Sequence, residues 1–172
     1  MTTFLFLDFD GVINNRDAER RNYIWPAWHP KAGTCSRVKW VSRDLIEKVE
    51  ELRAYADADV VISSTWRHHY GLGELCQILS PIPPERIIGI TPTLSRSLDS
   101  PFPDAIRGQE IEDYLRRDPC DRYVILDDYA KEKFLPDQHD KLIQTDKSVG
   151  IADENIVAAK KCLDSQAREV KV

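Results

Sequence analysis

Short apolar runs alternate with amphipathic segments along most of this chain, and this alternation constrains the fold more than any other feature. The runs are dominated by leucine, β-branched and aromatic residues, which is typical of strands buried on both faces. They lie at residues 4–7, 58–63, 86–90, 123–126 and 141–145. Apolar residues at helical spacing predict helices at about 42–55, 74–79 and 108–117, and a last one that begins at Asp153. The alternation predicts an α/β fold: a Rossmann-like three-layer α/β/α sandwich with a mainly parallel sheet.

The domain organisation follows from length and composition. The chain has 172 residues, of which 42% are hydrophobic and 31% charged, values that are ordinary for a globular protein. We expect one domain, residues 1–172, with a small cap or lid inserted after the first strand at residues 13–40, where no periodicity is sustained. The polar tail after Asp164 is expected to fray.

Charge and cysteine usage limit the compartment and the partners. The net charge of −5 argues against a general polyanion binder. The four cysteines, Cys35, Cys76, Cys120 and Cys162, form no C-x-x-C pair, which favours reduced thiols. No basic leader and no window of about 18 apolar residues is present, so we expect a cytoplasmic protein with no membrane partner. Nothing in the sequence indicates an obligate protein partner.

Paired carboxylates follow the first apolar run. Asp8 and Asp10 stand two residues apart at its end, and residues i and i+2 of a strand share a face. Gly11 then lets the backbone turn sharply past them. This arrangement predicts a site for a hard cation and a phosphate.

Polar side chains also follow two later strands. Ser63, Ser64 and Thr65 end the second predicted strand, and Asp127 with Asp128 end the fourth. The carboxyl ends of parallel strands meet at one edge of a sheet, so these groups are expected to surround one divalent ion. Mg²⁺ fits best, because it prefers oxygen ligands and needs only a few carboxylates beside a substrate phosphate.

Two other kinds of metal site fit this sequence less well. An EF-hand loop counted from Asp8 needs glycine at its sixth position, which is Ile13 here. His68 and His69 are adjacent, so in most backbones their rings point apart, and no third ligand is suitably spaced. Trp66, which follows the serines and Thr65 in sequence, is expected to pack rather than to bind substrate.

The motifs at the three strand ends resemble those of the haloacid dehalogenase (HAD) superfamily of phosphohydrolases. The matching segments are Asp8-Phe9-Asp10-Gly11-Val12, Val60-Val61-Ile62-Ser63 and Val124-Ile125-Leu126-Asp127-Asp128, in the order of that family. More narrowly, three segments resemble the HAD-type domain of multifunctional RNA-repair proteins: Ser63-Ser64-Thr65-Trp66-Arg67, Gly89-Ile90-Thr91-Pro92, and Thr145-Asp146 with Gly150-Ile151. Together these segments span nearly the whole chain.

The resemblance implies the chemistry of the acidic residues. Asp8 would be the nucleophile that forms an aspartyl-phosphate, in keeping with a carboxylate being ionised at neutral pH without a neighbouring base. Asp10 would be the general acid and base, with its backbone carbonyl as a metal ligand. The metal set is thus Asp8, Asp10, Asp127 and Asp128. Asp128 aligns best with the acid that binds magnesium directly, and Asp127 would be a second ligand or an outer-shell acceptor, with the reverse left open.

The resemblance also implies the groups that hold the phosphate. The hydroxyl of Ser63 would bind a phosphate oxygen, with Gly11, Ser64 and Arg67 as further contacts. The basic group of the family is usually a lysine; here Arg107 is the best match, since arginine is always charged and can fork onto two phosphate oxygens. Lys131 and Lys133 are its rivals.

The predicted cap bears on substrate size. An insert as short as 13–40 would leave the cleft open, which suits a phosphate at a nucleic-acid end better than an engulfed metabolite. Its residues Arg16, Arg20, Trp25, Trp28 and Lys31 would supply charge and stacking for a single strand, or the tryptophans would only hold the lid down. A small phosphorylated metabolite is the alternative substrate. A module that binds metal and phosphate without turnover is the alternative function.

Overall fold

The computed structural model describes residues 1–15, 41–97 and 99–169 of the chain. Most of the predicted cap, residues 16–40, lies outside the described residues, together with the expectations placed on Arg16, Arg20, Trp25, Trp28 and Lys31. The prediction of a single domain, and of a cap or lid at residues 13–40, therefore stays a prediction.

The sheet is parallel throughout its five strands. The strands are β1 (Thr3–Leu7), β2 (Asp59–Ile62), β3 (Ile87–Ile90), β4 (Arg122–Asp127) and β5 (Leu142–Gln144). Their order is β3-β2-β1-β4-β5, so β1 lies at the centre. Leu7 of β1 stands level with Ile62 of β2 and Leu126 of β4. The residues that follow these three strands are therefore brought to the same edge.

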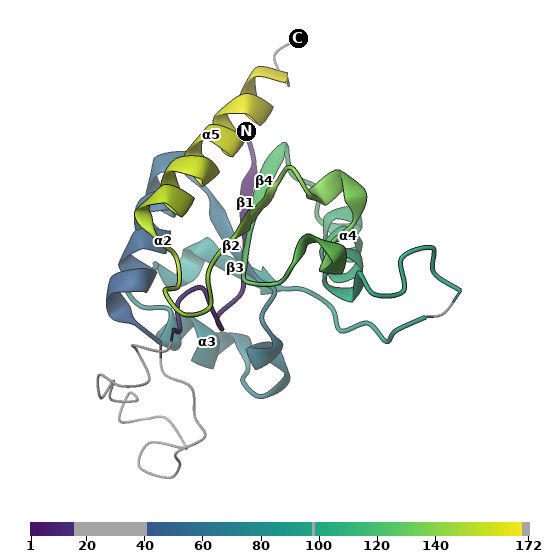
Figure 1. Ribbon diagram of the computed structural model, residues 1–172. Coiled ribbons are helices and arrows are strands. Elements are labelled where there is room, and N and C mark those ends of the chain that lie inside the picture. The colour runs from purple at the N-terminus through teal and green to yellow at the C-terminus, as the bar shows by residue number, and fades with distance from the viewer. Residues whose placement is uncertain (16–40, 98, 170–172) are drawn as a thin grey trace.

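Helices cover both faces of the sheet, which confirms the predicted α/β/α layers. Helices α2 (Arg43–Ala56) and α5 (Asp153–Glu169) lie together on one face, and α4 (Ile106–Arg117) lies on the other (Figure 1). The short α3 (Leu72–Ile78) lies near β3. Four single-turn 3₁₀ helices complete the described elements: η1 (Thr65–His68), η2 (Pro84–Arg86), η3 (Lys131–Lys133) and η4 (Pro136–Gln138).

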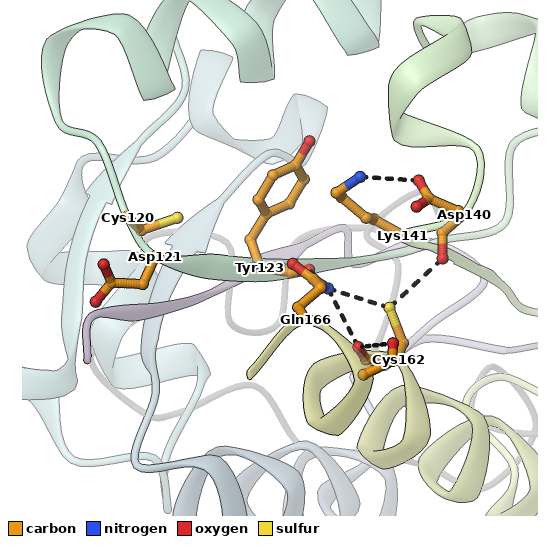
Figure 2. Close-up of a pocket in the computed structure, with 8 residues that line it drawn as sticks. Cys120, Asp121, Tyr123, Asp140, Lys141, Cys162 and Gln166 are labelled. Carbon is orange, nitrogen blue, oxygen red and sulfur yellow. Dashed lines mark hydrogen bonds and ion pairs between the residues drawn. The ribbon is translucent and has the colours of Figure 1, made fainter. Parts of the chain in front are cut away.

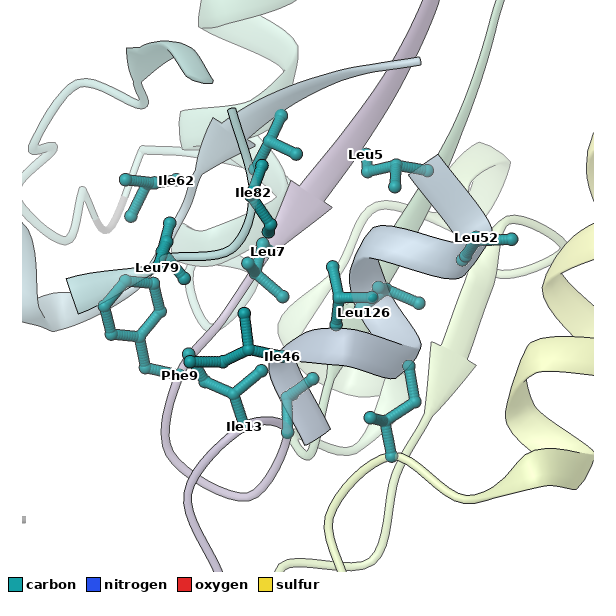
Figure 3. Close-up of a cluster of buried hydrophobic side chains, with 14 of the residues drawn as sticks. Leu5, Leu7, Phe9, Ile13, Ile46, Leu52, Ile62, Leu79, Ile82 and Leu126 are labelled. Carbon is teal, nitrogen blue, oxygen red and sulfur yellow. The ribbon is translucent and has the colours of Figure 1, made fainter. Parts of the chain in front are cut away.

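The core is divided by the alternation of side chains along β1. Leu5 and Leu7 face the side of α2 and α5, in a cluster that also contains Leu52 and Leu126 (Figure 3). Phe4 and Phe6 face the other side, with Ile111 of α4 and Phe134. All five residues of β1 are buried, which explains why its sequence is a continuous apolar run.

Two element boundaries differ from the sequence predictions. Helix α4 begins at Ile106 rather than near residue 108, which places Arg107 in its first turn. Helix α5 continues to Glu169, so the expectation that the chain frays after Asp164 was wrong. The side-chain amide of Gln166 explains the second difference: it accepts from the N–H of Tyr123 at 3.1 Å and donates to its carbonyl at 2.8 Å.

A pocket lies beside Gln166, at the amino end of the strands and away from the acidic motifs. Its volume is about 420 Å³, and Cys120, Tyr123, Lys141 and Cys162 are among the residues that line it (Figure 2). Cys76, Cys120 and Cys162 are free thiols, in keeping with the sequence expectation, while Cys35 lies outside the described residues. Burial raises the pKa of Cys120 to about 12, so this thiol is a poor nucleophile at neutral pH.

Candidate functional site

Backbone hydrogen bonds hold the chain together just past the carboxyl ends of β1, β2 and β4. The N–H of Asp8 donates to the carbonyl of Leu126 at 3.0 Å, and the N–H of Ser63 donates to that of Leu7 at 2.9 Å. Both bonds continue the parallel ladders by one residue past the strands. The polar residues after the three strands are thus fixed relative to one another by the sheet itself.

Three aspartates form an acidic group at this edge. One carboxylate oxygen each from Asp8, Asp127 and Asp128 lies within 4.8 Å of the other two. Asp8 is 3% exposed and Asp127 is 0% exposed, while Asp128 is half-buried. Oδ2 of Asp127 and Oδ1 of Asp128 are buried and find no hydrogen-bond partner among the described residues. Converging oxygens with free lone pairs fit a hard cation such as Mg²⁺.

Burial sets the electrostatics of the acidic group. It raises the pKa of Asp8, against the opposing effect of the Arg107 guanidinium. It also raises the pKa of Asp127 to about 8, with Asp8 adding to the shift. The pKa of Asp128 is raised as well, again mainly by burial. The charged forms of these acids are therefore disfavoured together, and a bound divalent cation would reverse that preference.

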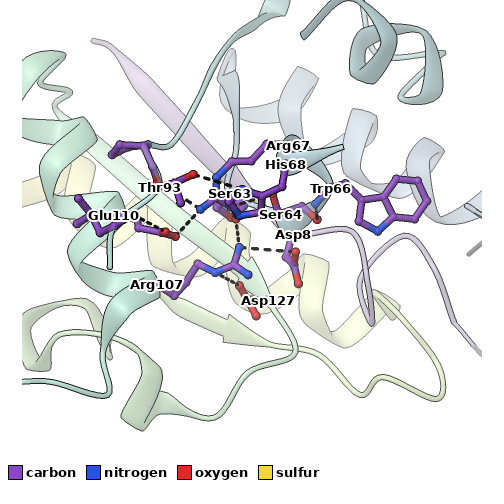
Figure 4. Close-up of polar contacts among 12 residues, drawn as sticks. Asp8, Ser63, Ser64, Trp66, Arg67, His68, Thr93, Arg107, Glu110 and Asp127 are labelled. Atoms are coloured by element: carbon purple, nitrogen blue, oxygen red, sulfur yellow. Dashed lines mark hydrogen bonds and ion pairs between the residues drawn. The ribbon is translucent and has the colours of Figure 1, made fainter. Parts of the chain in front are cut away.

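Arg107 lies against two members of the acidic group. From the first turn of α4 its Nη1 lies 3.7 Å from Oδ1 of Asp8, and its Nε lies 3.7 Å from Oδ2 of Asp127 (Figure 4). The same guanidinium donates to the carbonyl of Ser63 and lies over the ring of Tyr129, 5.2 Å from its centroid. Arg107 thus lies where a basic group could face a phosphate bound at Asp8, and its role there stays a prediction.

The rival lysines lie elsewhere. Lys131 and Lys133 both belong to η3 and are exposed. Within the described part of the chain, the ion pairs to Asp8 and Asp127 come from Arg107. The geometry favours the arginine over either lysine.

Asp10 lies in a tight loop after β1. Its Oδ1 accepts from the side-chain amide of Asn14 at 2.9 Å, and its Oδ2 accepts from the indole N–H of Trp66 at 3.2 Å. The negative charge of Asp10 raises the pKa of both Asp8 and Asp128, which places it beside the acidic group. Asp10 is therefore a neighbour of the group, held by donors of its own.

Gly11 is required by both its backbone and its surroundings. Its φ is +76°, in the region that favours glycine, and a Cβ added there would lie 2.6 Å from the carboxyl carbon of Asp128. Its carbonyl accepts from the hydroxyl of Thr145 at 2.7 Å, which ties this loop to the end of β5. Gly11 thus allows Asp128 to approach the loop; the predicted contact of Gly11 with phosphate remains a prediction.

The two serines after β2 have different surroundings. The hydroxyl of Ser63 is buried and has no hydrogen-bond partner among the described residues, so it is free to bind a ligand oxygen. Ser64 caps η1 by accepting from the N–H of Trp66 at 3.3 Å, and a side-chain hydrogen bond from Ser64 acts to lower the pKa of Asp8. Ser63 is the better placed of the two for the predicted phosphate contact.

Arg67 is turned into the protein rather than toward an open site. Its Nη1 donates to the carbonyls of Ser63 and Ser64 at 2.6 and 2.8 Å, and its Nη2 donates to that of Pro92 at 3.2 Å. Nη2 also forms an ion pair of 2.7 Å with Glu110 of α4. These contacts favour a role in holding the loop after β2, and the predicted phosphate contact of Arg67 gains no support from them.

Sequence reasoning missed three side chains of this region: Asn14, Trp66 as a hydrogen-bond donor, and Glu110. Glu110 had a readable signal, because it lies one helical turn after Arg107 and beside Ile111 on the buried face of α4. Asn14 and the indole N–H had none, since their contact with Asp10 depends on how a loop and a 3₁₀ turn approach each other.

Comparison with known families places the whole constellation in one group of proteins. Residues 4–156 match the family model described as the HAD domain in Swiss Army Knife RNA repair proteins. Neither the search of curated proteins nor the search of solved structures gave a match to the chain. The matched range contains every described residue of the candidate site.

Proposed function

The chain belongs to the family of HAD domains found in Swiss Army Knife RNA repair proteins, and on that basis we propose that it is a magnesium-dependent phosphomonoester hydrolase that works through an aspartyl-phosphate. The observation that carries the proposal is the convergence of Asp8, Asp127 and Asp128 within 4.8 Å beside Arg107. A buried acidic group with one adjacent cation is the arrangement that phosphoryl transfer needs, because catalysis there is mainly positioning and charge stabilisation.

Asp8 is the nucleophile in this proposal. One of its carboxylate oxygens attacks phosphorus, the bond between phosphorus and the leaving oxygen breaks, and Asp10 gives that oxygen a proton. In the second step water attacks the phosphorus of the aspartyl-phosphate, Asp10 takes the proton from water, and the carboxylate of Asp8 leaves. Inorganic phosphate is released and both aspartates return to their starting states.

Magnesium fits the acidic group on the chemistry of its donors. Asp8, Asp127 and Asp128 would hold the ion, together with the backbone carbonyl of Asp10, and the buried oxygens of Asp127 and Asp128 without hydrogen-bond partners support that assignment. When bound, the ion supplies positive charge that offsets the negative charge of a phosphoryl group. Asp128 is the first candidate for direct ligation, and Asp127 is the alternative.

Arg107 and Ser63 hold the phosphate oxygens in this proposal. Arg107 carries a fixed positive charge within 3.7 Å of the nucleophile, so it can lower the cost of bringing an anion to an anion. The free hydroxyl of Ser63 can donate to a phosphate oxygen from the neighbouring strand end. Ser64 and the loop at Gly11 are further candidate contacts.

We propose phosphorylated nucleic-acid ends as the substrate class, since the family takes its description from RNA-repair proteins. A small phosphorylated metabolite is the alternative substrate, and a module that binds metal and phosphate without turnover is the alternative function. None of the helices in the described part of the chain is long and apolar enough to cross a membrane. A cytoplasmic location, and the absence of an obligate protein partner, remain predictions from sequence.

Phosphate release from an aryl phosphate, with and without Mg²⁺, tests the proposed chemistry. We expect turnover in the wild type with the metal, and none in Asp8→Asn or Asp10→Asn, with both variants folded as judged by circular dichroism. Robust activity of Asp8→Asn would overturn the covalent mechanism. Comparing oligonucleotides that carry 3′- or 5′-phosphates with a panel of sugar and nucleoside phosphates tests the substrate class; a metabolite preferred over every oligonucleotide would favour the alternative.

A further inference from the structure

Trp66 makes a polar contact that its packing alone does not require. The indole is buried, at 7% exposure, and its ring lies 5.3 Å from that of Phe9 and 5.8 Å from that of Tyr70. Its Nε1–H points out of this aromatic contact and donates to Oδ2 of Asp10 at 3.2 Å. A buried indole usually finds an acceptor, but this one uses the carboxylate that the proposed reaction needs.

The backbone around Trp66 fixes where the indole points. Trp66 lies in η1, whose first turn is capped by the hydroxyl of Ser64. Arg67, the next residue, is held by the carbonyls of Ser63 and Ser64 and by Glu110 (Figure 4). Because the residues on both sides of Trp66 are held by these hydrogen bonds, its side chain has little freedom. Its N–H can therefore hold the loop after β1 in one position.

Asp10 is held from both sides. Trp66 donates to Oδ2 and Asn14 donates to Oδ1, so both carboxylate oxygens accept a hydrogen bond from a named side chain. An indole N–H can donate but cannot accept, so Trp66 can hold the carboxyl group without taking a proton from it. The two donors together fix the orientation of the carboxyl group.

We propose that Trp66 is a positioning residue for Asp10. Its N–H orients the carboxyl group so that it delivers a proton to the leaving oxygen when the aspartyl-phosphate forms. The inference rests on the proposed phosphatase activity. Trp66 is proposed to act through Asp10 and not by contact with the phosphate or the nucleophile.

The leaving group provides the test. Poor leaving groups such as alkyl phosphates need protonation as the bond to phosphorus breaks, whereas 2,4-dinitrophenolate leaves without it. The test compares kcat/KM of the wild type and of Trp66→Phe for two substrates, a nucleoside monophosphate and 2,4-dinitrophenyl phosphate. This parameter reports the steps through departure of the leaving group. We expect Trp66→Phe to lose about 10- to 100-fold on the alkyl ester and less than about threefold on the dinitrophenyl ester.

Phe9→Leu is the matched control for packing. Phe9 is buried against the same indole, so its truncation loosens the ring contact but leaves the N–H in place. We expect Phe9→Leu to lower the midpoint of thermal unfolding and to change both esters by similar factors. Equal losses on the two esters in Trp66→Phe would show that Trp66 acts only through packing and would overturn the inference.

The double variant separates the proposal from general damage. Asp10→Asn is not expected to turn over, but 2,4-dinitrophenolate leaves without protonation, so its release in a single turnover still reports formation of the aspartyl-phosphate in that background. Trp66→Phe should slow this release by less than about twofold when it is added to Asp10→Asn, because the group it positions is already disabled. An undiminished additional loss there would overturn the inference. Failure of the proposed function looks different: the wild type itself would release no phosphate from either ester.

Discussion

Asp127 is buried to 0% exposure against Arg107, whose Nε lies 3.7 Å from Oδ2 of the aspartate. The pair joins the end of β4 to the first turn of α4, and the same guanidinium lies 3.7 Å from Asp8. Burial acts to lower the pKa of Arg107, but Asp8 and Asp127 outweigh it and the net shift is upward. One cation therefore stabilises two buried carboxylates, and both stability and phosphate binding should depend on it.

Removing the charge of Arg107 should damage stability and activity together. We expect Arg107→Met to lower the free energy of unfolding of the metal-free protein by about 3–5 kcal/mol, because it leaves buried carboxylates without their partner. Arg107→Lys should lose less stability and less activity than Arg107→Met, since lysine keeps the charge but not the forked geometry. Urea unfolding monitored by circular dichroism and phosphate release from an aryl phosphate measure the two effects.

Arg43 supplies the control for Arg107→Met. It forms an exposed i,i+4 pair with Glu47 on α2, and its replacement by Met should change the free energy of unfolding by less than about 0.5 kcal/mol. An Arg107→Met protein that keeps wild-type turnover would show that the basic group of the site is another residue, and Lys131 and Lys133 would be tested next.

Magnesium binding should strengthen as pH rises toward 8. The pKa of Asp127 is raised by burial, and further by Asp8, from 3.8 to about 8 in the metal-free protein, whereas the metal binds the ionised form. Binding at pH 6 should therefore release protons, and at pH 9 it should release fewer. Isothermal titration calorimetry in buffers of different ionisation enthalpy measures both the affinity and the proton release.

The same shift predicts how stability depends on pH without metal. A pKa raised in the folded state means that the protonated carboxyl contributes fully below the pKa of the unfolded chain, near 3.8, and that this contribution is lost as pH rises through about 8. Saturating Mg²⁺ should restore stability at pH 8, by about 2.7 kcal/mol at 100 times its Kd. Asp127→Asn should weaken the pH dependence; a steeper one would contradict the assignment.

Much of this fold could be predicted because its strands are buried on both faces. A run such as Phe4-Leu5-Phe6-Leu7 is typical of a strand that is buried on both faces. The polar groups after each such strand then meet at one edge of the parallel sheet. The convergence of Asp8, Asp127 and Asp128 follows from that register. The pattern of apolar runs and the positions of the acids after them were enough to predict this convergence.

The remaining contacts could not be predicted, because they depend on tertiary approach rather than on periodicity. Gln166 was assigned to a fraying tail, yet its amide bonds to the backbone of Tyr123 and extends the helix. The motif predicts that Arg67 contacts phosphate, yet in the structure Arg67 forms an ion pair with Glu110 of α4. In both cases a polar residue contacts a partner that lies far away in sequence, and no local pattern encodes such a partner.

The Arg67–Glu110 pair gives the next prediction. Its side chains are 3% and 7% exposed, and breaking a buried pair leaves an uncompensated charge. We expect Arg67→Met alone to cost about 3–5 kcal/mol of unfolding free energy, and Arg67→Met with Glu110→Leu to cost less than the sum of the single variants. Urea unfolding of the four proteins gives the coupling energy.

Helix α4 itself offers the comparison pair. Arg116 and Glu112 form an i,i+4 ion pair on its exposed side, and a cycle on these residues should give a coupling of only about 0.3–0.5 kcal/mol. A coupling for Arg67 and Glu110 as small as this would mean that the buried pair does not stabilise the loop after β2, and the phosphate contact predicted for Arg67 would regain its place.

Gly11 allows the most direct test of the geometry of the acidic group. A Cβ at this position would lie 2.6 Å from the side chain of Asp128, and φ is +76°, so Gly11→Ala must displace that carboxylate and strain the loop. We expect at least about a tenfold loss of Mg²⁺ affinity by calorimetry, comparable to the loss of a metal-site partner. Gly73→Ala in α3 is the control, because its Cβ meets nothing within 4 Å and alanine favours helix. Unchanged affinity in Gly11→Ala would mean that Asp128 is not a ligand, and Asp127 would then be the acid that binds the ion.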